Sequence, residues 1–179
     1  MSDARTPLTV QDLKECKARG ERIVTLTCYD VLFARLLDEC GVDVLLVGDS
    51  VNQLLAGAET TLSATLDQMI YHTKSVRRGS ERALVICDMP FLTYQVSREE
   101  AIRNCGRVLA ETGCQGVKVE GGQPIAGTVR ALPQCPASGA NAARASWSRA
   151  ERQAARTARQ LAAKPTAWCR LQESNRARK

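Results

Sequence analysis

The chain has 179 residues, a net charge of +6, 44% hydrophobic residues and only 4% aromatic residues. This length suits one domain with or without an appendage. It is shorter than the roughly 200 residues of a full eight-stranded β/α barrel. The composition excludes collagen-like, coiled-coil and wholly disordered chains. No apolar run reaches the roughly 18 residues of a membrane span, and the N-terminus lacks a signal-peptide core, so we expect a soluble intracellular protein.

Short β-branched apolar runs alternate with helical patterns along residues 9–122. The pattern predicts helices and strands in the chain order helix 9–19, strand 23–29, helix 31–40, strand 42–48, helix 63–78, strand 83–87, helix 97–112 and strand 116–119. This alternation predicts an α/β protein whose parallel strands are joined by right-handed crossovers. The sheet is either doubly wound or part of a barrel, and periodicity alone does not decide between them.

Polar residues and glycines mark the helix ends. Asp30 is a good N-cap for the second helix and Ser63 for the third, while Ser97 with Glu100 predicts a capping box for the fourth. Glycines follow the predicted last helical residues, at Gly20, Gly41, Gly79 and Gly113.

Acidic residues follow each of the four predicted strands: Asp30, Asp49, Asp88 and Glu120. The carboxyl ends of parallel strands lie on one face of an α/β fold, so these acids would repel one another unless a cation neutralises them or their pKa values rise. They are hard oxygen ligands, which favours Mg²⁺. For Asp30 we favour simple N-capping, because a helix starts directly after it. Long loops follow Asp49 and Asp88, and capping explains those two poorly.

Lys118 and His72 are the other candidate site residues. Lys118 lies two positions before Glu120, on the same side of its strand, where it would pair with carboxylates or bind a substrate carboxylate; ion pairing is the commoner outcome. His72, the only histidine, lies within a predicted helix and is expected to pack or hydrogen-bond rather than to catalyse. No Walker-type loop follows Gly121-Gly122 and no GxGxxG follows a strand, so nucleotide binding is disfavoured.

The eight cysteines do not form a disulfide or zinc pattern. Two of them, Cys28 and Cys87, lie in predicted strands, and Cys16, Cys40 and Cys105 lie in predicted helices. No pair has CxxC spacing, which leaves a structural zinc site without support. Free thiols in a reducing compartment are the better interpretation, and we therefore expect a cytoplasmic location.

Five stretches stand in the order and spacing of one enzyme family. They are TLTCYD (25–30), LLVGDSV (45–51), TTLSATLDQMIYHTKSVRRG (60–79), CDMPF (87–91) and GVKVEGG (116–122). On these motifs, residues 9–122 resemble the ketopantoate (3-methyl-2-oxobutanoate) hydroxymethyltransferase family. The resemblance implies a (β/α)₈ TIM barrel related to the phosphoenolpyruvate/pyruvate enzymes, here truncated to about its first four β/α units, and assembly into homo-oligomers.

The resemblance also implies a metal-dependent transferase of pantothenate and coenzyme A biosynthesis. Its substrates would be the α-keto acid 3-methyl-2-oxobutanoate and 5,10-methylenetetrahydrofolate, which donates the hydroxymethyl group that gives 2-dehydropantoate. By resemblance, Asp49, Asp88 and Glu120 surround Mg²⁺, and Asp49, Ser50, Asp88 and Lys118 contact the keto acid. A metal on the ketone would stabilise the enolate that attacks the one-carbon unit.

The last third of the chain differs from the rest in charge and composition. Residues 1–122 carry 14 Lys and Arg against 17 Asp and Glu, whereas residues 123–179 carry 11 against 2. The segment 123–179 has 15 alanines and 9 arginines but only five Ile, Leu, Val, Met or Phe residues, too few for half a barrel core. We expect 1–122 to form a partial barrel with the metal and keto-acid site. We expect 123–179 to be a basic tail, largely disordered or with a marginal helix over 144–163.

Two origins of the tail are open. One is the frame-shifted translation of a GC-rich gene, which the other reading frames of the DNA would reveal, and the other is a genuine appendage that binds RNA or an acidic surface. The family's later segments, with a histidine near the metal, the glutamate that acts as general base and much of the folate pocket, have no counterpart here. No catalytic base is therefore assigned.

Two main hypotheses follow: a hydroxymethyltransferase, or an inactive fragment that keeps only metal and keto-acid binding. A nucleic-acid-binding module is a distant third, because the excess positive charge lies in the tail alone. With two unpaired sheet edges, the isolated chain is expected to be poorly stable or aggregation-prone.

Overall fold

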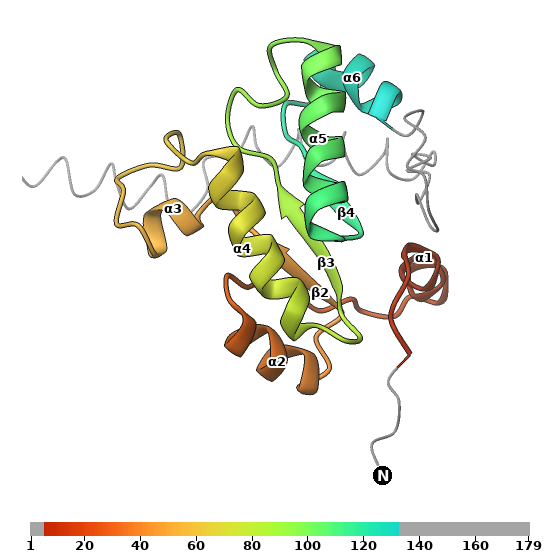
Figure 1. The fold of residues 1–179 in the computed structure, drawn as a ribbon. Coiled ribbons are helices and arrows are strands. Elements are labelled where there is room, and N and C mark those ends of the chain that lie inside the picture. Colours follow the sequence, from red (N-terminus) through yellow and green to blue (C-terminus); the bar gives the residue numbers. More distant parts are fainter. Residues whose placement is uncertain (1–5, 133–179) are drawn as a thin grey trace, which may run out of the picture. The chain divides into compact units, whose positions relative to one another are not determined.

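The computed structural model describes residues 6–132 of the chain (Figure 1). By internal contacts the chain divides into the units Met1–Arg144 and Ala145–Lys179, and everything below concerns the described part of the first unit. The predicted helix over 144–163, and the tail from residue 133 onward, lie outside the described residues. Within residues 6–132, no helix has both the length and the apolar character needed to cross a bilayer.

Four parallel strands form one sheet in the order of the sequence. They are β1 (Thr25–Thr27), β2 (Val44–Val47), β3 (Leu84–Asp88) and β4 (Gly116–Lys118). Each strand pairs in parallel with the next, with Thr25 opposite Val44, Val44 opposite Leu84 and Ile86 opposite Gly116. The predicted α/β alternation with parallel strands is confirmed, and all four carboxyl ends lie on the same edge of the sheet.

The two central strands carry the core. Both β2 and β3 are apolar on both faces, and their side chains Leu45, Val47, Val85 and Cys87 are fully buried. Helix α4 (Leu66–Gly79) contacts both strands, so these side chains have apolar neighbours rather than water. Strand β1 is exposed along its whole length and is one of the two edge strands of the described sheet, the other being β4.

The remaining long helices are the predicted ones: α1 (Val10–Arg19), α2 (Val31–Glu39) and α5 (Arg98–Thr112). Asp30 caps α2 as expected, because its carboxylate accepts from the N–H groups of the second and third helical residues. At the start of α5 the Ser97 hydroxyl accepts from the N–H of Glu100, which is one of the two bonds of the predicted capping box; the return bond to the Glu100 side chain is not present. Gly20 and Gly113 end their helices in the left-handed conformation, at φ 74° and 68°.

The start of α4 differs from the prediction. Thr65, not Ser63, is the N-cap, and it forms a reciprocal capping box with Gln68. The Ser63 hydroxyl instead accepts a hydrogen bond of 2.7 Å from Asn52 Nδ2. Two good capping residues, Ser63 and Thr65, precede the apolar pattern. Only Thr65 has a Gln three residues later, which completes the capping box.

The end of α4 also differs. Gly79 is the last residue of the helix rather than a residue beyond it. A Cβ at this position would lie 2.4 Å from Val31 O and 2.7 Å from the Cβ of Ala34. Glycine is therefore required by the close packing of α4 on α2 and not by a left-handed turn.

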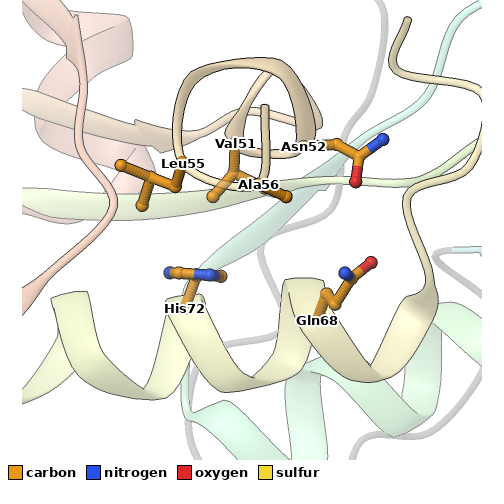
Figure 2. A pocket seen from close by; sticks show the side chains of 6 residues that line it. All are labelled: Val51, Asn52, Leu55, Ala56, Gln68 and His72. Atoms are coloured by element: carbon orange, nitrogen blue, oxygen red, sulfur yellow. The ribbon is translucent and has the colours of Figure 1, made fainter. Parts of the chain in front are cut away.

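A short helix, α3 (Val51–Leu54), was not predicted and lies in the expected loop after β2. Asn52 ties it to the following loop through hydrogen bonds to Thr60 O and to Ser63 Oγ. Between α3 and α4 lies a small crevice of about 150 Å³, into which His72 and Gln68 project from α4 (Figure 2).

Beyond residue 122, where the partial barrel was predicted to end, the chain continues in two short elements. These are the 3₁₀ turn η1 (Gln123–Ile125) and helix α6 (Ala126–Ala131), which contacts α5. Ile125 and Leu132 pack against the apolar core, so this segment belongs with the sheet and its helices.

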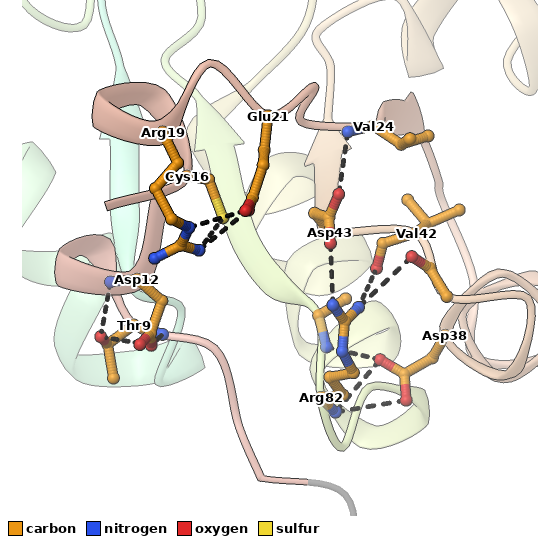
Figure 3. Close-up of polar contacts among 12 residues, drawn as sticks. Thr9, Asp12, Cys16, Arg19, Glu21, Val24, Asp38, Val42, Asp43 and Arg82 are labelled. Atoms are coloured by element: carbon orange, nitrogen blue, oxygen red, sulfur yellow. Dashed lines mark hydrogen bonds and ion pairs between the residues drawn. The ribbon is translucent and has the colours of Figure 1, made fainter. Parts of the chain in front are cut away.

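Carboxylates anchor the loops at the amino ends of the strands (Figure 3). Asp38, only 3% exposed, accepts hydrogen bonds from the backbone N–H groups of residues 81–83, the shortest being 2.6 Å. Asp43 accepts from Val24 N–H at 2.9 Å and from the Arg82 guanidinium at 2.8 Å. These bonds hold β1, β2 and β3 in register at the end of the sheet away from the candidate site.

Candidate active site

The end of β3 and the end of β4 bring three predicted site residues into contact. Asp88 and Lys118 are the last residues of their strands and lie opposite each other in the sheet. Lys118 Nζ donates to both carboxylate oxygens of Asp88, at 2.8 and 2.9 Å, and to Glu120 Oε1 at 2.5 Å. The predicted ion pairing of Lys118 is confirmed, and it links Asp88 at the end of β3 to Glu120, two residues beyond β4.

Asp49 faces the same space from the end of β2. Together with Asp88 and Glu120 it lines a cavity of about 610 Å³, a volume within the usual range of small-molecule sites. The rest of the wall is largely apolar and includes Leu62, Met89, Phe91 and Ile125. The cavity therefore has both carboxylates and apolar side chains in its lining.

The charges in this cavity do not cancel. Burial raises the pKa of Asp88; the Lys118 ammonium opposes this rise, and the negative charges of Asp49 and Glu120 reinforce it, so the pKa lies above its usual value. Burial alone would lower the pKa of Lys118, but its bonds to Asp88 and Glu120 outweigh burial and raise it. One ammonium thus pairs with two carboxylates, and the negative charge of Asp49 acts on Asp88 as well, so the surplus of negative charge favours a further cation.

The carboxylate oxygens at this site are the type of ligand that a divalent metal ion binds. Within residues 6–132, no three His, Cys, Asp or Glu side chains are close enough together to hold one ion as they stand, and Asp88 and Glu120 are bonded to the Lys118 ammonium. Mg²⁺, however, commonly takes one or two protein carboxylates and completes its shell with water and substrate. Asp49 and Asp88, facing one cavity, meet that requirement, and Glu120 is a third oxygen donor beside them.

Ser50 lies at the edge of this group and not in contact with Lys118. It occupies the N-cap position of α3 but makes no capping bond, and its Oγ lies 2.8 Å from the hydroxyl of Tyr29. His72 Nδ1 in turn donates to the backbone oxygen of Tyr29 at 2.8 Å, which requires the tautomer with the proton on Nδ1. His72 thus has the hydrogen-bonding role that was predicted for it.

Sequence reasoning missed Tyr94. This tyrosine lies in the loop between β3 and α5, is only 4% exposed and lines the cavity. Its hydroxyl accepts a 3.1 Å hydrogen bond from the backbone N–H of Glu120. No periodic pattern covers this loop, and only the presence of a large aromatic residue in an otherwise turn-like segment could have drawn attention to it.

Comparison with known proteins places the chain in a family. Residues 7–137 match the family model described as ketopantoate hydroxymethyltransferase. The chain is 49% identical over 132 residues to the 3-methyl-2-oxobutanoate hydroxymethyltransferase of Pelobacter propionicus, covering 74% of this chain and 49% of that protein. It is 50% identical over 129 residues to the protein of that name from Prosthecochloris aestuarii, covering 70% and 47%. The chain therefore spans about half the length of the curated relatives it matches.

Solved structures agree on the fold. One described as 2,3-dimethylmalate lyase, a PEP mutase/isocitrate lyase superfamily member, superposes with a TM-score of 0.52 at 17% identity, over 72% of this chain and 49% of that one. Another, oxaloacetate acetylhydrolase, gives a TM-score of 0.51 at 19% identity over the same shares. At these identities the likeness shows the fold alone, and it confirms the barrel-type α/β architecture.

Proposed function

The chain belongs to the ketopantoate hydroxymethyltransferase family, and we propose that its cavity binds 3-methyl-2-oxobutanoate for transfer of a hydroxymethyl group from 5,10-methylenetetrahydrofolate. The product of this reaction is 2-dehydropantoate, an intermediate of pantothenate biosynthesis. The observation that carries the proposal is the cluster of Asp88, Lys118 and Glu120 at the ends of neighbouring parallel strands, with Asp49 facing the same cavity.

The charged groups suit an α-keto acid. Lys118 is the cation best placed to pair with the substrate carboxylate, since its ammonium bonds to Asp88 and Glu120, two carboxylates that line the cavity. We assign the Ser50 hydroxyl, beside Asp49, as a further polar contact for the substrate. Met89 and Phe91 supply apolar wall for the isopropyl group. A ligand with an anionic group and a branched alkyl group therefore matches the two kinds of side chain, charged and apolar, at the cavity.

We assign Asp49, Asp88 and Glu120 as the oxygen ligands of a divalent cation, with Mg²⁺ as the expected ion. When bound, such a cation would polarise the ketone and stabilise the enolate that adds to the one-carbon unit. The chain's own contribution is to orient the keto acid through Lys118, and to keep water away from its alkyl end with the apolar wall.

A second candidate function is binding without turnover. Among residues 6–132, the carboxylates that line the cavity are Asp49, Asp88 and Glu120, and each is already assigned to the cation or to Lys118. No described carboxylate is then left to remove the proton from carbon 3 of the keto acid. Because the chain also spans only half of its relatives, a fragment that retains metal and keto-acid binding alone is the alternative.

The proposal places the protein in a reducing, cytoplasmic environment, where folate-dependent biosynthesis takes place. The six cysteines of the described part are all unpaired, in agreement with that location. Burial raises the pKa of Cys87 and of Cys105 to about 12, so these thiols stay protonated and unreactive.

One experiment separates the two candidates. The full chain is incubated with Mg²⁺, 5,10-methylenetetrahydrofolate and 3-methyl-2-oxobutanoate, dehydropantoate is measured by mass spectrometry, and keto-acid binding is measured by calorimetry. Product supports the transferase, and binding without product supports the fragment. Asp88→Asn is expected to weaken binding by more than about tenfold, since a hydrogen-bonded charge is lost. The exposed Asp67→Asn serves as the control with no effect. If the unchanged protein binds neither Mg²⁺ nor the keto acid, both candidates fail.

A further inference from the structure

The loop that carries Tyr94 is built to hold its ring in the cavity. Leu92 has a left-handed backbone with φ of 64°, a conformation that residues other than glycine rarely adopt. Both the N–H and the hydroxyl of Thr93 donate to Pro90 O, at 3.2 and 2.7 Å. Asn104 of α5 donates to Thr93 O at 2.7 Å and ties this turn to the helix. The residue that follows, Tyr94, is only 4% exposed and lines the cavity.

The Tyr94 hydroxyl accepts a hydrogen bond but also has a proton that it can donate. Its oxygen accepts the N–H of Glu120, the first residue of the turn that continues through Gly121 and Gly122, both with positive φ. A tyrosine hydroxyl has one proton to donate as well as lone pairs to accept. Within residues 6–132, no hydrogen bond donated by this hydroxyl accompanies the one that it accepts, although the side chain lines a cavity with Asp88 and Glu120. The proton is therefore available for a molecule in the cavity.

We propose that Tyr94 is a further substrate-binding residue, whose hydroxyl donates to an oxygen of the α-keto acid while it accepts from the Glu120 N–H. This inference rests on the proposed function, because it takes the keto acid as the occupant of the cavity. The accepted bond and the buried ring hold the hydroxyl oxygen in place, so a bond donated by this hydroxyl costs little further side-chain freedom. Anionic substrate oxygens are good partners for such a donor.

The test compares keto-acid and metal binding by the full chain. In Tyr94→Phe the ring stays but the hydroxyl is lost, and we expect the Kd for 3-methyl-2-oxobutanoate to rise about fivefold to tenfold. The Kd for Mg²⁺ alone should change less than twofold, roughly within the error of calorimetry. The matched control is Tyr71→Phe, on the exposed face of α4, where 70% of the residue is accessible and neither Kd should change.

Each outcome decides between defined alternatives. If the unchanged protein binds the keto acid and Tyr94→Phe binds it equally well, the inference is overturned and the proposed function stands. If Tyr94→Phe weakens Mg²⁺ and keto acid by the same factor, Tyr94 only holds the Glu120 turn, and the donor role is overturned. If the unchanged protein does not bind the keto acid, the proposed function fails and this inference falls with it.

A second measurement covers the case in which Tyr94→Phe does not fold. The chain has three tyrosines, so 3-fluorotyrosine gives three ¹⁹F resonances, assigned by Tyr71→Phe and by Tyr29→Phe. Saturation with the keto acid should shift the Tyr94 resonance and leave the Tyr71 resonance in place. An unmoved Tyr94 resonance at saturation would contradict the inference.

Discussion

Carboxylates lie at both ends of the parallel sheet, but the two ends hold them in different ways. At the amino ends of the strands, Asp38 accepts three backbone N–H groups and Asp43 has an arginine partner. At the carboxyl ends, Asp88 and Glu120 share one ammonium, that of Lys118. The first arrangement stabilises the fold, while the second has unbalanced charge and a cavity beside it, which are features of a binding site.

The largest effect is expected at Asp38. In Asp38→Ala the buried N–H of Ala83 and the part-buried N–H groups of Glu81 and Arg82 lose their acceptor, and the free energy of unfolding should fall by about 3 kcal/mol. Urea denaturation measures it. The neighbouring exposed Glu39→Gln is the control and should change stability by less than about 0.5 kcal/mol. Equal values for the two variants would contradict a structural role for the amino-end carboxylate.

The next effect is expected at Gly79, where α4 meets α2 near the same end of the sheet. In Gly79→Ala the new methyl group would overlap Val31 O and Ala34, and unfolding should become easier by about 2 kcal/mol. Gly106→Ala within α5 is the matched control, because a Cβ there meets nothing within 4 Å. That variant should be stabilised by up to about 1 kcal/mol. Thermal unfolding of both variants would show opposite shifts, and a shared sign would contradict the packing argument.

At the carboxyl ends of the strands we expect a substitution to weaken metal binding more than it lowers stability. The Glu120 side chain is 70% exposed, so Glu120→Gln should lower stability by less than about 0.5 kcal/mol. The same change should weaken Mg²⁺ binding roughly tenfold, because a donor oxygen near the cation loses its charge. Calorimetric titration with MgCl₂ provides the measurement. A variant that binds Mg²⁺ normally would remove Glu120 from the ligand set.

The smallest expected effect is on the pH dependence of stability, which should differ between the carboxylates at the two ends of the sheet. Burial alone would raise the pKa of Asp43, but hydrogen bonds from Val24 and Arg82 outweigh it, and the pKa lies below its ordinary value of 3.8. Asp43 therefore contributes stability that is present above that value and is lost as the pH falls through the folded-state pKa. Burial raises the pKa of Asp88 above 3.8, so its contribution is present at low pH and declines as the pH rises.

Two variants read out this difference. The free energy of unfolding is measured between about pH 2.5 and 6 for the unchanged protein and both variants. In Asp43→Asn this free energy should increase less with pH than in the unchanged protein. In Asp88→Asn it should increase more, because the decline that Asp88 contributes is removed. Slopes that change in the same direction in both variants would show that the two carboxylates do not differ in the way described.

Local patterns predicted most of the fold. Asp30, Ser97 and the glycines at 20 and 113 were predicted in their capping roles, because a cap depends on residues within one turn. The function of Gly79 was missed because it is determined by α2, more than 40 positions away in the sequence. The acceptor role of Asp38 depends on residues 81–83 and was missed for the same reason.

The candidate site was predictable in part. Asp88, Lys118 and Glu120 meet because they end adjacent parallel strands, which alternation and strand length indicate without a structure. Tyr94 could not be placed, because its position depends on a left-handed turn at Leu92 and on a bond to a different loop. The contact between Tyr29 and Ser50 joins two strand ends through side chains alone, and no spacing rule predicts it.

Strand β1 has a further consequence for how the protein behaves in a test tube. Within the described residues its outer edge has no neighbouring strand, and Leu26 on it is 44% exposed. Such an edge can pair with a strand of another protein molecule. Self-association should then grow with protein concentration while the fold itself is intact, so dilution, rather than cooling, is the condition that preserves monomers during purification.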